Sequence, residues 1–163
     1  MEDNYESFED DMDDLVNHLP ACIQLRVWVS FQTPLCIRAL KSQMESMNPT
    51  INVATMKNVF GKRDTEIYTP YRIEFPNWQK TGPGMWKCPV PQKDFMELFS
   101  AASNLPVAAY PEPGMFGVDG SGYEIRISDG GFVHAHYHWW MAPPKGWEGL
   151  GNLVDRMMGM IGV

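Results

Sequence analysis

The sequence predicts a single α+β domain in which an antiparallel sheet carries helices packed mainly on one face. Three observations predict this class. Several stretches alternate apolar and polar residues, as strands with one buried face do. Four other stretches repeat apolar residues at helical spacing, and Gly- or Pro-containing turns separate many of the elements. A chain of 163 residues fits one core, so we expect one domain over residues 1–163.

Residues 5–18 predict an amphipathic helix that ends before Pro20. Its apolar stripe consists of Tyr5, Phe8, Met12, Leu15, Val16 and Leu19. The acids lie on the other face, near the positive N-terminal end of the helix dipole. Residues 1–14 hold eight acids and no Lys or Arg, a charge of -8, whereas the whole chain carries -7. The net negative charge therefore comes from this acidic segment, defined as residues 1–14, and the rest of the chain sums to about zero.

The remaining elements follow from the same two periodicities. We expect strands at residues 22–32, 51–56, 65–75, 122–128 and 132–140. We expect further helices at residues 33–48, 92–103 and 147–161. Thr33-Pro34 predicts the start of the first of these, because proline is favoured in a first helical turn. The two strands from 122 to 140 predict a β-hairpin around Asp129-Gly130-Gly131, joined to the closing helix as one unit.

Residues 76–91 predict a loop, because four prolines and two glycines interrupt them. The same stretch contains Trp78 and Trp86, and large aromatic side chains favour packing against the body of the protein. Where such side chains are exposed they also suit a contact with a partner. We therefore interpret Trp78 and Trp86 as candidate partner-binding residues.

Three histidines alternate along the last predicted strand. His134, His136 and His138 fall on one face of that strand, and neighbouring imidazoles on a sheet can ligate zinc. The alternative, which we favour, puts Val133, Ala135, Tyr137 and Trp139 on the buried face and leaves the histidines on a solvated face beside Glu124 and Arg126. We expect no bound metal and no cofactor.

Catalytic patterns are missing from the sequence. There is no Gly-x-Ser-x-Gly elbow, and the glycine-rich stretches are neither a dinucleotide-binding motif nor a P-loop. The cysteines Cys22, Cys36 and Cys88 lie in or next to apolar runs, where a thiol packs as a small apolar group. We therefore expect a protein without enzymatic activity.

The charge distribution limits the classes of partner. Nucleic-acid binding needs a basic stripe, and the basic residues here are scattered. No apolar run reaches the length of a membrane span, and the acidic start lacks the basic region of a signal peptide. We expect a cytoplasmic protein whose partner is a protein with a basic surface, contacted through the carboxylates of Glu6, Glu9, Asp10, Asp13 and Asp14.

A short set of residues near the C-terminus is similar to a known class of proteins. It comprises Asp119-Gly120, Tyr123-Glu124-Ile125, a Gly-containing turn, Tyr137, Trp139-Trp140, Pro143-Pro144, Trp147 and a leucine-bearing helix. This order, over residues 119–155, resembles the C-terminal part of small bacterial proteins that look like immunity proteins. The resemblance implies a non-enzymatic inhibitor with an α+β fold that binds a secreted antibacterial toxin in the cytosol of the producing cell.

The leading hypothesis is therefore an immunity-type inhibitor that binds a toxin domain through the acidic segment. Two alternatives stay open. One is a metal-binding module or metal-dependent enzyme built on His134, His136 and His138. The other is a subunit of a larger assembly whose interface is the loop at residues 76–91.

Overall fold

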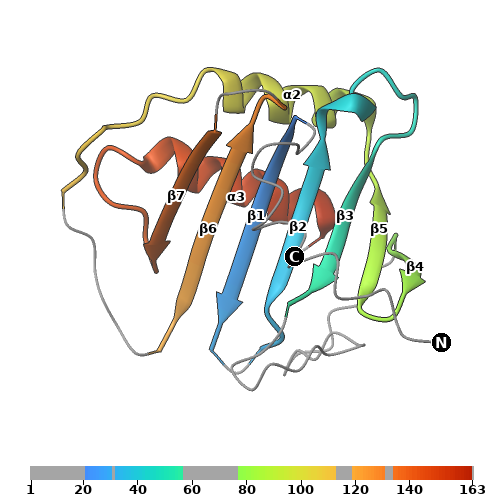
Figure 1. The fold of residues 1–163 in the computed structure, drawn as a ribbon, viewed down its shortest axis with the longest axis horizontal. Coiled ribbons are helices and arrows are strands. Elements are labelled where there is room, and N and C mark those ends of the chain that lie inside the picture. Colours follow the sequence, from blue (N-terminus) through green and yellow to red (C-terminus); the bar gives the residue numbers. More distant parts are fainter. Residues whose placement is uncertain (1–20, 31, 57–76, 113–118, 131–133, 163) are drawn as a thin grey trace.

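The computed structural model describes residues 21–30, 32–56, 77–112, 119–130 and 134–162. These residues form a seven-stranded antiparallel sheet with both described helices on one side of it (Figure 1). The strands are β1 (Cys22–Val29), β2 (Leu35–Leu40), β3 (Thr50–Thr55), β4 (Gln79–Gly82), β5 (Met85–Pro89), β6 (Ser121–Ser128) and β7 (His134–Trp140). The helices are α2 (Gln92–Ser103) and α3 (Glu148–Ile161). The predicted α+β class is confirmed.

The strand order is β4-β5-β3-β2-β1-β6-β7. β1 lies between β2 and β6, so it joins the strands of the first half of the chain to the hairpin of the second half. Its register places Leu25 opposite Ile37 on β2 and opposite Ile125 on β6. Residues that are directly opposite share a face of the sheet, so these three side chains form one apolar row.

The core lies between this apolar side of the sheet and the two helices. Ile23 and Leu25 of β1 are fully buried, and Val27 is 4% exposed. The helices cover these strands with buried apolar side chains, which are Phe95, Leu98, Phe99, Leu150, Leu153, Val154, Met157 and Ile161. The spacing of three and four residues along each helix directs these side chains to one stripe.

The helix predicted at residues 33–48 is wrong. This stretch forms strand β2, followed by a short 3-10 helix at Lys41–Gln43. The positions Ile37 and Leu40 fit a helical stripe, but Leu35, Cys36 and Ile37 are all buried, as in a strand with both faces covered. Pairing with β1 on one side and β3 on the other decides the outcome. Met47, the last position of the supposed stripe, is 86% exposed.

The loop predicted at residues 76–91 contains a second hairpin, made of β4 and β5, at one edge of the sheet. Pro83 and Gly84 form its turn, and Gly84 has φ 65°, which glycine adopts without strain. Pro83 and Gly84, which favour a loop in the sequence, therefore form the turn of a hairpin. The expectation that this stretch packs against the body is confirmed, because the Trp78 indole N–H donates a hydrogen bond to the carbonyl of Ile161 at 2.8 Å.

The other predicted elements divide into those confirmed and those outside the described residues. The helix at 92–103, the closing helix and the strands at 22–32 and 51–56 are confirmed, although β1 ends at Val29. The antiparallel pairing of the last two predicted strands is confirmed between Gly122 and Trp140, with residues 131–133 outside the described residues. The helix predicted at 5–18 and the strand predicted at 65–75 lie outside the described residues. In the described part of the chain, no helix is long and apolar enough to cross a membrane.

Truncating a buried side chain of α2 should lower the free energy of unfolding, whereas truncating an exposed side chain of the same helix should hardly change it. Leu98 is fully buried, so Leu98→Ala should lower the free energy of unfolding by about 3 kcal/mol through lost burial and the cavity left behind. Met96→Ala, two residues away on the same helix and 46% exposed, should change it by about 0.5 kcal/mol or less. Urea unfolding of both variants measures this, and equal losses would contradict the packing described here.

Glu148 provides a pH-dependent contact at the start of α3. Its own backbone N–H and that of Gly146, at 2.9 Å, donate to its carboxylate and hold the pKa of Glu148 below its ordinary value. A lowered folded-state pKa stabilises the fold above the unfolded-state pKa, and this stabilisation is lost as the pH falls through the folded-state pKa. Glu148→Gln should therefore be less stable than the natural chain at pH 7, and the difference should shrink below about pH 4. Chemical unfolding at both pH values tests this, with exposed Glu45→Gln as the charge control; a difference independent of pH would contradict it.

Candidate functional site

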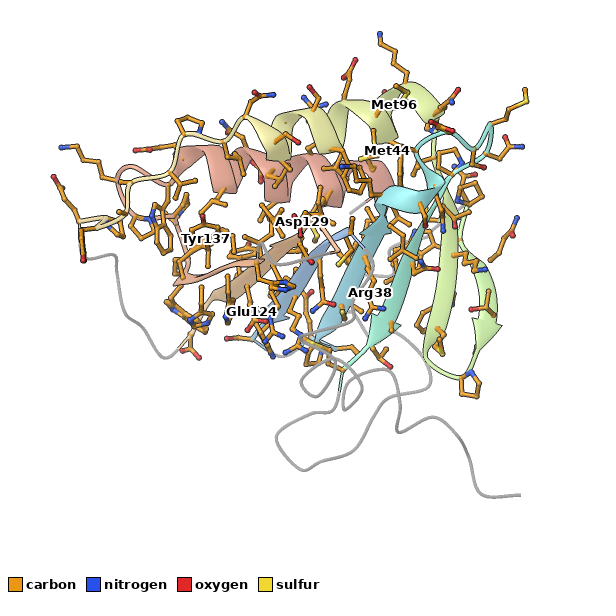
Figure 2. The ribbon with its side chains drawn as sticks, turned by 45° about the horizontal axis from the view of Figure 1, so that its top comes forward. Arg38, Met44, Met96, Glu124, Asp129 and Tyr137 are labelled. Carbon is orange, nitrogen blue, oxygen red and sulfur yellow. The ribbon has the colours of Figure 1, made fainter. Side chains whose placement is uncertain are left out.

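The side of the sheet away from the helices carries a cluster of charged and polar side chains. Because β1 alternates, Gln24 and Arg26 point to this side while Leu25 points to the core. The register places Gln24 between Arg38 of β2 and Arg126 of β6, and it places Arg26 opposite Glu124. Figure 2 shows Arg38 and Glu124 on the side of the sheet opposite the helices. We call these five residues the arginine face.

Glu124 is the acid of the arginine face. Its carboxylate oxygen Oε1 lies 2.8 Å from Arg126 Nε and 3.6 Å from Arg26 Nη1. Its other oxygen, Oε2, lies 3.3 Å from Nε2 of His136. The contact between Arg126 Nε and Glu124 Oε1 is an ion pair, because the angles at these two atoms do not meet those of a hydrogen bond. The Glu124 side chain is only 12% exposed, so water screens these contacts weakly.

Gln24 is the most buried polar residue of this cluster. It is 1% exposed, and neither atom of its side-chain amide has a hydrogen-bond partner among the described residues. A buried amide without partners costs about 1–3 kcal/mol relative to one that is hydrogen-bonded. Three arginines surround it, two directly opposite on the neighbouring strands and one two residues along β1. The arginine face therefore combines positive charge with an unsatisfied amide at its centre.

Aromatic side chains adjoin the arginine face at one end of the sheet. Gly122 lies opposite both Trp28 of β1 and Trp140 of β7. A Cβ atom at Gly122 would meet the Trp140 ring at 3.1 Å, so the absence of a side chain lets this ring lie over the strand. His138 contacts Trp28 edge to face, with ring centroids 6.2 Å apart. Arginine-rich surfaces beside aromatic rings suit polypeptide segments that carry carboxylates.

The three histidines lie as the favoured interpretation expects. His134, His136 and His138 are exposed on the side of Glu124 and Arg126, whereas Ala135, Tyr137 and Trp139 face the helices. Val133 lies outside the described residues. In the described stretches, no three His, Cys, Asp or Glu residues gather closely enough to hold a metal ion. His136 contacts Glu124 and His138 contacts Trp28, so these two rings have separate neighbours.

Of the two tryptophans proposed to contact a partner, Trp86 belongs to the core and Trp78 packs against it while partly buried. Trp86 is 9% exposed and Trp78 is half-buried, with their ring centroids 6.1 Å apart. The Trp78 indole N–H donates to the carbonyl of Ile161 at the end of α3, and the Trp86 ring lies against the Trp78 ring. Their role in partner binding stays a prediction without structural support.

The acidic residues proposed to contact a partner, Glu6, Glu9, Asp10, Asp13 and Asp14, lie outside the described residues. The described residues themselves are electrically neutral, with nine Lys or Arg and nine Asp or Glu. The described part of the chain therefore carries no net charge, in contrast to the acidic segment.

The cysteines are buried, as expected for thiols that pack as small apolar groups. No disulfide links Cys22, Cys36 and Cys88. Burial raises the pKa of the Cys22 thiol, against a smaller lowering by Arg38, and burial also raises the pKa of the Cys88 thiol. Thiols with raised pKa values are poor nucleophiles at neutral pH. Cys22 and Cys36 point to the side of the arginine face, whereas Cys88 belongs to the core.

A cleft of about 530 Å³ opens on the helix side of the sheet, beyond the end of α2. Apolar side chains such as Phe99 and Tyr137 line it, and Lys41 stands at its rim. Two hydroxyls in its lining are already used locally. Ser103 donates to the carbonyl of Phe99, and Ser128 accepts from the N–H of Gly130. The cleft offers apolar surface with few converging polar groups, so we assign it no ligand.

The sequence indicated the histidines, Glu124 and Arg126 as neighbours but missed Gln24, Arg26 and Arg38 as members of the same cluster. A partial indication was available, because the polar positions of residues 22–32 include Gln24 and Arg26. Arg38 was assigned to a helix, and this error concealed the cluster.

Loss of the Glu124 carboxylate should remove its contacts with Arg26, Arg126 and His136. We expect Glu124→Gln to lower the free energy of unfolding by about 3 kcal/mol, the scale for breaking a largely buried ion pair. Glu97 is the matched control, because its carboxylate contacts Arg156 at 3.1 Å on the exposed side of the helices. Glu97→Gln should cost about 0.5 kcal/mol. Equally small losses for Glu124→Gln and Glu97→Gln in thermal or urea unfolding would show that the Glu124 ion pairs contribute no more to stability than an exposed pair.

Comparison with known proteins gives no relative from which a function could be inferred. No protein-family model, curated protein or solved structure matches the chain.

Proposed function

We propose that this protein is a non-enzymatic inhibitor of the immunity type, which binds a basic partner such as a toxin domain through the carboxylates of its acidic segment. The observation that carries the proposal is the division of charge. Residues 1–14 carry -8, whereas the described residues are neutral. A cluster of charges of one sign attracts an oppositely charged surface at long range and raises the association rate.

The residues that resemble immunity proteins form one packed unit, which is consistent with the proposal. The Trp147 ring, next to the first residue of α3, contacts the rings of Tyr137 and Trp139 on β7. The Trp147 indole N–H also donates to the carbonyl of Ala108 at 2.9 Å. These contacts hold the last hairpin and the last helix together as a rigid body. A rigid body of this kind is a suitable support for a binding segment.

The contact residues in this proposal are acids, without Trp78 and Trp86. Trp78 and Trp86 contact each other, Trp86 is buried, and the indole N–H of Trp78 is taken by the carbonyl of Ile161. We place the encounter in the cytosol, where an inhibitor of a toxin made by the same cell must act. Binding and occlusion of the toxin would suffice, because an inhibitor needs no chemical step of its own.

The test uses the products of the genes on either side of the gene for this chain, among which the proposal expects a toxin domain. The chain should restore growth of bacteria that express the toxin domain, and the purified pair should bind. Replacing Glu6, Glu9, Asp10, Asp13 and Asp14 with the corresponding amides should raise the Kd on the order of a hundredfold at low salt. The affinity of the natural chain should also fall steeply as salt is raised, because salt screens exposed charges.

A matched control removes charge from the two described helices. Glu97→Gln with Asp155→Gln neutralises two acids on α2 and α3 and should leave the Kd nearly unchanged. An unchanged Kd after neutralisation of the acidic segment would contradict the proposal. Failure of the natural chain to bind or to protect would also contradict it.

A further inference from the structure

The two edge strands of the described sheet differ in how they resist the addition of another strand. β4, at one end, has only four residues and an irregular register between Lys80 and Gly82. β7, at the other end, pairs regularly with β6 over all seven of its residues (Figure 1). It contains no Pro, Gly, Lys, Arg, Asp or Glu. Short length, bulges, lysine and proline are the features that protect edge strands, so β7 is an unprotected edge.

The pairing of β7 with β6 determines which of its backbone groups point outward. Met141, the residue after β7, donates its backbone N–H to the carbonyl of Ser121 at 2.7 Å. Hydrogen-bonded pairs alternate with non-bonded pairs in an antiparallel ladder, so the odd-numbered residues of β7 bond to β6. The even-numbered residues direct N–H and C=O away from β6, and they are His134, His136, His138 and Trp140. In the described part of the chain, no other backbone group bonds to this outward row.

The side chains of β7 are held against their own chain. The exposed His136 has Nε2 3.3 Å from Oε2 of Glu124 on β6, and the His138 ring contacts Trp28 on β1 edge to face. Both rings therefore lean over the sheet to which β7 already belongs. On the helix side, the Tyr137 ring contacts the ring of Trp147. An approaching strand would consequently meet the outward row of backbone donors and acceptors.

β7 is complementary to a second β7. In an antiparallel pair with its two-fold axis at Tyr137, His136 lies opposite His138 of the second copy, and His134 lies opposite its Trp140. This register pairs all seven residues and matches each outward-pointing residue with another, as hydrogen-bonded pairs require. On the helix side it puts the small Ala135 opposite the large Trp139. The described body is electrically neutral, so two such bodies approach without net repulsion.

We propose that β7 is the interface of a homodimer, in which two copies of the chain pair their β7 edges in the register centred on Tyr137. The outward row forms four hydrogen-bonded pairs, each exchanging two backbone bonds. Residues that are directly opposite share a face, so the two sheets become one, with the helices of both copies on one side and both arginine faces on the other. The dimer goes beyond the proposed function and needs no toxin, so either proposal can fail without the other.

The first test is analytical ultracentrifugation of the full-length chain over a range of concentrations at pH 8. The natural chain should follow a monomer–dimer equilibrium. His136→Lys with His138→Lys should raise the dimer Kd about tenfold, because each lysine then lies opposite a lysine of the second copy. The matched control, Gln79→Lys with Thr81→Lys, adds the same charge at exposed positions of β4 and should leave the Kd unchanged. A natural chain that stays monomeric, or equal Kd values for all three proteins, would overturn the proposal.

Disulfide cross-linking tests the register and does not depend on the lysine variants. His136→Cys and His138→Cys are made as two separate proteins and oxidised with diamide, singly and as a mixture. In the proposed register the two positions lie opposite each other with Cα atoms about 5.5 Å apart, which a disulfide can bridge. Two copies of the same variant hold their new thiols about 9 Å apart, which is too far.

The mixture should therefore give a linked dimer, and each variant alone should not. The natural Cys22, Cys36 and Cys88 are buried, and mass spectrometry of the linked peptides separates their products from those of the new thiols. Linkage as strong in either single variant as in the mixture would overturn the proposed register. A dimer that forms without linkage in the mixture would place the interface elsewhere and overturn the proposal.

Discussion

The alternation of β1 is the constraint on which the rest of the structure depends. Leu25 and its neighbours on one side meet the apolar rows of β2 and β6 and support both helices. Gln24 and Arg26 on the other side meet Arg38, Arg126 and Glu124. A shift of register by one residue would exchange the two sets and bury charge under the helices. The core and the arginine face are therefore two results of the same pairing.

The parts of the fold that the sequence predicted well are those whose local pattern and tertiary pairing agree. The hairpin β6–β7 is an example, because its alternation, its turn residues and its register all indicate the same structure. β2 is the opposite case. Its apolar spacing fits a helix as well as a strand, and only the neighbouring β1 and β3 decide between them. The β4–β5 hairpin was missed because its strands are short and lie between prolines.

The candidate site was predictable only in part, since it depends on register across several strands. The side on which His134, His136 and His138 lie followed from alternation within one strand. The placement of Arg38 beside Gln24 required the correct pairing of β1 with β2, which no local pattern contains. The burial of Trp86 was likewise decided by the partner strands β3 and β4. A sequence indicates which residues alternate, whereas the sheet order determines which of them meet.

The contact of Trp78 with the end of α3 links two regions that are distant in the sequence. The last carbonyl groups of a helix have no partner within it, and the Trp78 indole N–H satisfies that of Ile161. The edge hairpin and the C-terminal turn of the helix are consequently one mechanical unit, in which fraying of either end breaks the same hydrogen bond. Loss of this hydrogen bond would accompany the first melting of the closing helix.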